Sequence, residues 1–349
     1  MFGFFKKREP DVQKVDLAAV NNREKAEALH RAGLLQKLFM RPLKFGGDEH
    51  PLNTIFVPPA VVKQKVDIDE QVIEPLIEAA KVTKYSVKPE YEGASVVPTS
   101  LTITVSDPET YKFPIAIWGS AIDRAVEASD RVYAAREALY SQHFGAIDGD
   151  VQKLMNLTGV WPGGCLVQIH AARHQLWVSS SFGLTNPDMP ARTRTEQYAV
   201  EQDSQGRATR YSMRLVGRPP RAVPADWAGY GYEILLLTRE KGYWPLGFLN
   251  WAVQAEILND MDLRRRIHKY GAMTVEDVSI GEGKSGDFLI APIQQFAPAS
   301  IALPNGSMEL LVATLITRPQ MQYGIEKGGL ALLAELNQTG HGQISQTPG

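Results

Sequence analysis

One segment near the middle of the chain constrains the fold more than any other: "SAIDRAVEASDRVYAAREALYSQHFG" at residues 120–145. Ser120 and Asp123 form a capping-box-like start, and Gly145 closes the segment. Between them runs an apolar stripe of Ile122, Val126, Val132, Leu139 and Tyr140. The pattern predicts a long amphipathic helix that bridges two domains. A length of 349 residues suits two domains, each able to bury its own core.

The chain before this helix mixes helical and strand-like patterns. "NNREKAEALHRAGLLQKLFM" opens with asparagine caps and predicts a helix from Asn22, with one face made of Leu29, Ala32, Leu35 and Phe39. A second helix is predicted from Asp69, with Val72, Leu76 and Ala80 facing inward. Short apolar runs predict strands within residues 50–59 and at residues 84–88, 100–105 and 113–118.

The chain after the long helix is rich in strand patterns. "CLVQIHAARHQLWVSSSFGLT" predicts two strands about a tight turn at residues 171–173, and a second hairpin is expected over residues 195–215 around Asp203. "GYGYEILLLTRE" predicts a strand with Glu233 at its apolar centre, and Pro245 starts a further helix. Hairpins together with separate helices indicate an α+β fold.

The overall composition narrows the classes of function. Apolar residues make up 44% and charged residues 22%, the values of an ordinary globular protein. A formal net charge of -2 gives no general attraction to nucleic acid or to an anionic membrane. No apolar run approaches the length of a membrane span. The single cysteine, Cys165, lies in an apolar strand pattern and predicts a small core residue in a reducing, cytoplasmic compartment.

The segment "SIGEGKSGDFLIAP" at residues 279–292 contains the last three letters of a phosphate-binding loop. Such a loop has a glycine five residues before Gly283, where this chain has Val278, and it leads into a helix. The run that follows is short, apolar and closed by Pro292, which indicates a strand. We therefore expect a polar turn between two strands and no nucleotide site.

One pair of residues has the spacing of metal ligands: His170 and His174 in "HAARH". The flanking residues indicate strands, Arg173 adds a repelling charge, and no third ligand is evident. Ordinary turn histidines are the favoured interpretation, with a metal-dependent, hydrolase-like enzyme as the alternative. No nucleophile elbow and no dinucleotide fingerprint occurs in the sequence, and we predict neither catalytic residues nor a cofactor.

Six stretches belong together: "REALYSQHFG", "LVQIHA", "HQLWVSSSFGLTNPDMP", "GYGYEILLL", "WPLGFLNWAVQAEI" and "NGSMELLVATLITRPQMQYGIEKGGLALLAEL". Taken in order, they resemble the Suppressor of fused domain family, and the resemblance runs from about Glu137 to Gly340. The resemblance implies a C-terminal domain with a mixed sheet and flanking helices. We thus expect a flexible tail at residues 1–20, an α+β domain of unknown family at 21–118, a Suppressor of fused-like domain at 119–340 and a flexible tail at 341–349.

The resemblance also implies a function. Members of the family are protein-binding modules without established catalytic residues, and bacterial members are thought largely to be immunity proteins that neutralise polymorphic toxins. The expected partner is another protein or peptide, such as a toxin domain, and not a nucleic acid. A two-partner adaptor is a further alternative. "TNPD" replaces the family's usual Ser-Asp after Gly183, which puts a contact through that acid in doubt and leaves Asp188 as its substitute.

Aromatic residues are prominent on the strand-rich half, where Tyr and Trp suit partly buried protein interfaces. The predicted partner contacts are Trp177, Phe182, Asp188, Tyr230, Tyr232 and Glu233. The last three lie on one strand, and the alternative interpretation is that they have a structural role.

Overall fold

The computed structural model of this protein describes residues 15–147, 151–154, 157, 159–202, 205 and 208–346, without the side chains of 197–202 and 208–214. The chain divides into two compact units between Ala125 and Val126. This division lies inside the long helix α4 (Ser120–His143), whereas the sequence placed the domain boundary just before that helix. Within the described residues, none of the helices has the length and apolarity needed to cross a bilayer.

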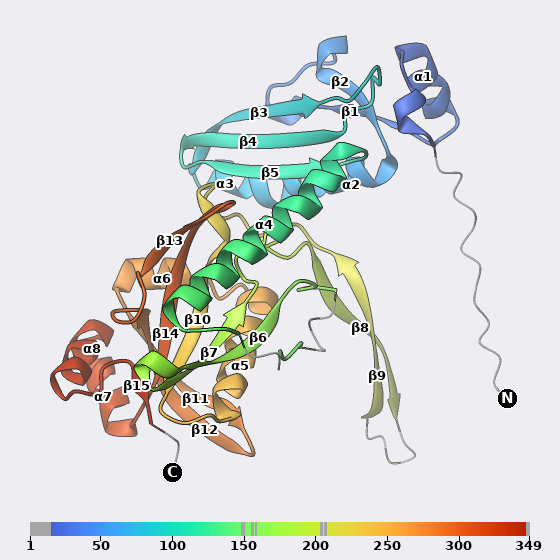
Figure 1. Ribbon diagram of the computed structural model, residues 1–349. Helices are drawn as coiled ribbons and strands as arrows, with labels where there is room; N and C mark the ends of the chain where they lie inside the picture. Colours follow the sequence, from blue (N-terminus) through green and yellow to red (C-terminus); the bar gives the residue numbers. More distant parts are fainter. Residues whose placement is uncertain are drawn as a thin grey trace. The chain divides into compact units, whose positions relative to one another are not determined.

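The first unit contains a three-stranded antiparallel sheet and a separate two-stranded one (Figure 1). Its elements are η1 (Leu17–Ala19), α1 (Arg23–Arg31), β1 (Gln36–Phe39), η2 (Leu43–Phe45), η3 (Pro51–Asn53), β2 (Thr54–Val57), α2 (Pro59–Ile68), the π-helical turn η4 (Asp69–Ile73), α3 (Glu74–Glu78), β3 (Val82–Glu90), β4 (Ser100–Pro108) and β5 (Tyr111–Ala116). Alternate residues of β4 and β5 are buried, so one face of this sheet forms a core.

Two helices of the first unit differ from the sequence prediction. Helix α1 starts as expected, with Asn22 as its cap, but it ends at Arg31, because Gly33 follows with a positive φ of 75°. Leu35 and Phe39 therefore lie outside the helix. The second helix begins at Pro59 and not near Asp69, since proline suits the first turn of a helix.

The π-helical turn η4 lies over a buried polar cluster. The Lys65 ammonium is 2.5 Å from a carboxylate oxygen of Asp69, and the Tyr85 hydroxyl donates to the other oxygen at 2.7 Å. Burial lowers the pKa of Lys65, because water no longer solvates the ammonium. The turn thus presents Asp69 to the one buried lysine of the described residues, and the pair is satisfied internally.

The second unit is built on an eight-stranded mixed sheet. The main path runs in the order β11-β12-β14-β10-β7-β6, where β10 and β14 are parallel and the other neighbours are antiparallel. The strands are β6 (Cys165–Ala171), β7 (Leu176–Phe182), β10 (Trp227–Thr238), β11 (Met273–Gly281), β12 (Lys284–Pro292), β13 (Ser300–Leu303), β14 (Gly306–Ile316) and β15 (Ile344–Ser345). A separate hairpin joins β8 (Thr193–Gln202) and β9 (Ala208–Gly217) as the sequence predicted, while its expected turn residue Asp203 lies outside the described part.

Helices pack on both faces of this sheet (Figure 1). Helices α5 (Trp244–Asn259) and α6 (Leu263–Tyr270) contribute to one core with Phe248, Val253 and Ile267. Helix α4 contributes Val132, Tyr140 and Phe144 to the core on the other face. Helices α7 (Arg318–Lys327) and α8 (Gly329–Gln338) enclose a smaller core with β12. The predicted α+β class and the mixed sheet with flanking helices are confirmed.

Two predictions at the edges of elements differ from the structure. Ile122 and Val126 of the expected apolar stripe on α4 are exposed, while Val132 and Tyr140 are buried. Residues 341–346 belong to the expected C-terminal tail, yet Ile344 and Ser345 pair with Leu237 and Thr238 of β10 as the strand β15. Residues 15–20 of the expected N-terminal tail include the turn η1 and the buried Val20.

Two glycines shape the start of β10. Gly229 and Gly231 have positive φ angles of 54° and 81°, and the register with β14 shifts between Trp227 and Tyr232. A Cβ on Gly229 would lie 2.4 Å from the carbonyl oxygen of Leu184. Both the conformation and the close approach of the Leu184 backbone therefore require glycine at this position.

We expect Gly229→Ala to lower the free energy of unfolding by about 2–4 kcal/mol, because the backbone strain and the clash with a backbone atom add together. Urea denaturation followed by circular dichroism measures the loss. Gly217→Ala is the matched control: nothing lies within 4 Å of its added Cβ, and the expected change is below about 0.5 kcal/mol. Equal stability of the Gly229 variant and wild type would contradict the explanation.

Candidate functional site

The centre of the second unit holds a buried carboxylate, that of Glu233 in the middle of β10. Ser181 Oγ donates to Glu233 Oε2 at 2.6 Å, and Thr185 Oγ1 donates to Oε1 at 2.7 Å. The backbone N–H groups of Gly183 and Thr185 donate to the same Oε1 at 2.9 and 3.1 Å. The tract after β7 therefore folds around the side chain of Glu233, which is fully buried.

Arg136 of α4 provides the opposite charge. Its Nη1 lies 3.5 Å from Glu233 Oε1 and donates to Thr185 Oγ1 at 2.8 Å, while Nη2 donates to Asn186 Oδ1 at 2.9 Å. The guanidinium also lies 4.1 Å from the centre of the Phe182 ring. Neither side chain has exposed surface, so their mutual attraction and these hydrogen bonds must offset the loss of solvation by water.

A second buried carboxylate, that of Glu256, lies on α5. Tyr232 Oη donates to Glu256 Oε2 at 2.6 Å, and the N–H of Leu263 donates to the same oxygen at 3.0 Å. Arg221 forms an ion pair with the other oxygen and lies 4.8 Å from the centre of the Tyr230 ring. Burial raises the pKa of Tyr230 to about 12, so its hydroxyl remains protonated at physiological pH. This network connects the start of β10 to α5.

Most of the predicted contact residues belong to these two networks or pack against them. Phe182, Tyr230, Tyr232 and Glu233 are all buried, and each has its neighbours within the second unit. Of the six predicted contacts, Trp177 and Asp188 have accessible surface. Asn186, in the "TNPD" stretch, is buried and accepts a hydrogen bond from Arg136 Nη2. That position therefore contributes to the core, and Asp188 is the exposed acid beside it.

Trp177 belongs to a group of accessible side chains that we call the Trp177 surface. The His170 ring is stacked on Trp177 with 4.9 Å between ring centres, and Lys241 Nζ lies 5.0 Å from the Trp177 ring. Gln168 Nε2 donates to the carbonyl oxygen of Gly242, which ties the 239–243 loop to β6. The surface is defined by His170, Trp177, Lys241, Tyr243 and Trp244, and Tyr243 is 81% exposed.

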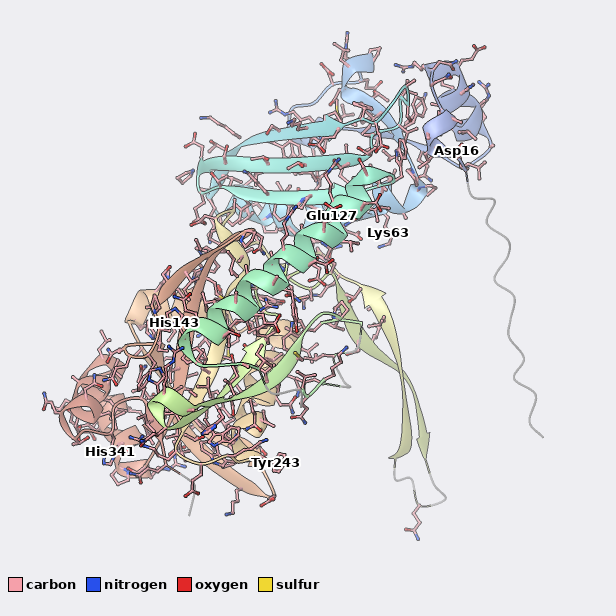
Figure 2. The ribbon with its side chains drawn as sticks, in the orientation of Figure 1. Asp16, Lys63, Glu127, His143, Tyr243 and His341 are labelled. Carbon is pink, nitrogen blue, oxygen red and sulfur yellow. The ribbon has the colours of Figure 1, made fainter. Side chains whose placement is uncertain are left out.

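A cleft of about 430 Å³ adjoins this surface. Tyr243, Trp244 and Leu246 from the start of α5 form one side of it, and Gly281, Glu282 and Lys284 from the β11–β12 turn form another. Figure 2 labels Tyr243. This turn is the "GEGKSG" segment, and it connects two antiparallel strands as predicted. The segment therefore lies beside accessible aromatic residues and does not lead into a helix.

The two histidines with metal-ligand spacing have different neighbours. His170 is stacked on Trp177, whereas His174 Nε2 lies 3.1 Å from the carbonyl oxygen of His143 and its ring lies 4.9 Å from the Phe296 ring. Over the part of the chain that the structure describes, no group of three or more His, Cys, Asp or Glu side chains could hold a metal ion. Among the described residues, the structure therefore shows no third ligand that would join His170 and His174 at a metal site.

Sequence reasoning missed Arg136 and Lys241. Arg136 follows the helical pattern of a solvated residue, and its only signal is that Glu233 in an apolar strand requires a cation or several donors. Lys241 has no signal in the sequence, because its place over the Trp177 ring depends on the pairing of Thr238 with Trp177.

No family model matches the sequence, and no curated protein matches it either. Among solved structures, a Suppressor of fused homologue from Neisseria gonorrhoeae is 13% identical, with a TM-score of 0.38, over 63% of this chain and 94% of its own. A Sufu–Fu complex is 12% identical, with a TM-score of 0.37, over 63% and 89%. Drosophila Suppressor of Fused is 12% identical, with a TM-score of 0.27, over 52% and 38%. These matches are with the family that the sequence motifs resemble.

We expect Glu233→Gln to lower the free energy of unfolding by about 3–5 kcal/mol, because it leaves the buried Arg136 without its counter-charge. Urea denaturation measures the effect, and Glu282→Gln, which neutralises an exposed glutamate, is the control. Arg136→Met combined with Glu233→Gln should destabilise the protein by less than the sum of the two single changes. Additive effects would show that the two residues do not interact.

We also expect Cys165 to resist alkylation in the native protein. Burial raises the pKa of its thiol to about 11, and the side chain is buried on β6. At pH 8 iodoacetamide should label Cys165 in urea and leave it unlabelled in the native state, as determined by mass spectrometry. Rapid native labelling would instead indicate an accessible thiolate.

Proposed function

We propose that this protein is a non-enzymatic, protein-binding module of the cytoplasm, and that its second unit contacts the partner through the Trp177 surface. The observation that carries the proposal is the accessible stack of His170 on Trp177 with Lys241 near the same ring, and the exposed Tyr243 follows Lys241 by two residues. Flat aromatic rings with a polar tip provide contact area with little loss of side-chain entropy, and such residues are enriched at protein interfaces.

The interior of the second unit supports a binding role over catalysis. The hydroxyls of Ser180 and Ser181 are buried and hydrogen-bonded inside the protein, and so is the carboxylate of Glu233. Each is therefore occupied in holding the fold. The sequence resemblance to the Suppressor of fused domain family favours the same class of function, as a matter of analogy.

The more specific proposal is that the partner is a polymorphic toxin and that this chain is its immunity protein. This proposal rests on the bacterial members of the family that the sequence resembles. A mixed surface of aromatic and cationic groups would match a toxin surface that presents apolar and acidic side chains.

A two-partner adaptor is the second candidate. It is favoured by one observation: each unit has hydrophobic core clusters of its own, such as Val20, Leu35 and Phe56 in the first. Cross-linking of the full chain in its host would test this, because an adaptor should yield separate partners on the two units.

Affinity capture of the tagged full-length protein from its own host tests the binding role. Wild type should retain a near-equimolar partner at moderate salt, and Trp177→Ala and Tyr243→Ala should each lose most of it. Central interface aromatics typically contribute at least about 2 kcal/mol, roughly a thirtyfold loss of affinity. Tyr270→Ala is the matched control, because Tyr270 is an exposed tyrosine on α6 outside the Trp177 surface.

The outcomes separate the coarse proposal from the specific one. A partner that is the C-terminal domain of a large secreted protein, with an activity that the captured chain inhibits, would support the immunity role. A partner of another kind would support binding and reject that role. Equal retention by the two surface variants and Tyr270→Ala would reject the Trp177 surface as the contact.

A further inference from the structure

A cleft of about 550 Å³ lies in the second unit, away from the Trp177 surface in its lining residues. Its lining comes from Asp277 of β11, the start of β12, the end of β14, the start of α7, the end of α8 and the segment that includes β15. Figure 2 labels His341, which belongs to this lining. None of the predicted contact residues lies in it, so the cleft has no role in the function proposed above.

Acidic side chains outnumber arginine in the lining of the cleft. Arg318 pairs with two carboxylates of the lining, Asp277 at 2.8 Å and Asp287 at 3.1 Å, and with Glu276, which is not part of the lining, at 3.3 Å. The carboxylates around Arg318 therefore outnumber its one guanidinium, two of them within the lining. Arg318 is also the first residue of α7, where the helix dipole disfavours a cation, so the carboxylates account for its position.

Two polar groups in this lining retain unused hydrogen-bonding capacity. Asp287 is buried, and its Oδ1 accepts from the N–H of Asp277 at 3.0 Å while its Oδ2 forms an ion pair with Arg318 Nε at 3.1 Å. Each carboxylate oxygen can accept a second hydrogen bond. Thr314 is 2% exposed, and within the described residues its Oγ1 has no hydrogen-bond partner. A buried hydroxyl without a partner is rare, and a ligand group in the cleft would give it one.

The rest of the lining is suited to an apolar stem. Leu315, Leu336 and Ile344 provide aliphatic surface next to the polar groups. A chain of methylene groups that ends in a cation combines the two properties, because its stem lies on apolar side chains while its head makes charged hydrogen bonds.

We propose that this cleft binds an organic cation, an alkylguanidinium or alkylammonium group, whose head contacts Asp287 and Thr314 and whose stem lies against Leu336 and Ile344. Arg318 shares the same carboxylates and competes with the ligand for them. Because the Arg318 side chain is 59% exposed, it can move into solvent when the ligand enters.

The test uses the full chain and n-butylguanidinium as the probe, with binding followed by saturation-transfer NMR. n-Butanol, which has the same stem without the charge, is the ligand control. We expect the cation to receive saturation and to show a Kd, and the alcohol to receive little. Equal binding of both would overturn the proposal, because the carboxylates would then contribute nothing.

Variants locate the binding and have effects of opposite sign. Asp287→Asn should weaken binding by about tenfold or more. The more exposed Asp277→Asn should weaken it by about two- to fivefold. Arg318→Gln should tighten binding by a similar factor, because it removes the internal competitor. Glu326→Gln removes a charge from the same helix outside the cleft and should change nothing.

Circular dichroism establishes that each variant is folded, and Asp277→Asn keeps the test valid if Asp287→Asn is not. Unchanged affinity in both Asp277→Asn and Arg318→Gln would overturn the proposal. A further arm identifies the natural source of the cation: N-acetyl-arginine methylamide is compared with its citrulline counterpart. Binding of the arginine compound with the same dependence on variants indicates a protein side chain, whereas binding of butylguanidinium alone indicates a free small-molecule cation.

Discussion

The second unit depends on the burial of one carboxylate. Glu233 lies at the centre of the sheet. A buried carboxylate is stable there only if its oxygens accept hydrogen bonds and an opposite charge lies close to it. The backbone of residues 183–185 meets the first condition and Arg136 of α4 meets the second. The carboxylate therefore fixes the course of a loop and the position of a helix that come from separate parts of the chain.

This arrangement gives a physical meaning to the sequence resemblance. The stretches that contain Arg136, Ser181 and Glu233 are far apart in sequence, and the structure brings them into one network. Gly229, which precedes Glu233 on β10, is needed for the same packing, because the Leu184 backbone approaches it too closely for a side chain. These motifs thus specify the interior of the unit. The accessible residues around Trp177 are the proposed partner contacts.

Local patterns in the sequence predicted most of the secondary structure, and the reasons for the exceptions are specific. The strand with Glu233, the helix that starts at Pro245 and the hairpin with "GKS" follow from periodicity and turn chemistry. The start of α2 was missed, because Pro58 and Pro59 end a strand and begin a helix at once. The burial of Phe182 and the exposure of Tyr243 were not predictable, because both depend on contacts between distant segments.

The order of strands in the main sheet has a consequence for how the protein is made. β14 lies between β12 and β10, although it is the last long strand in the chain. Until β14 leaves the ribosome, the strands on its two sides have no neighbour between them, and the parallel pairing of Leu235 with Val312 cannot form. The sheet can be completed only after β14 has been synthesised, so until then the nascent chain exposes unpaired apolar strand edges to chaperones.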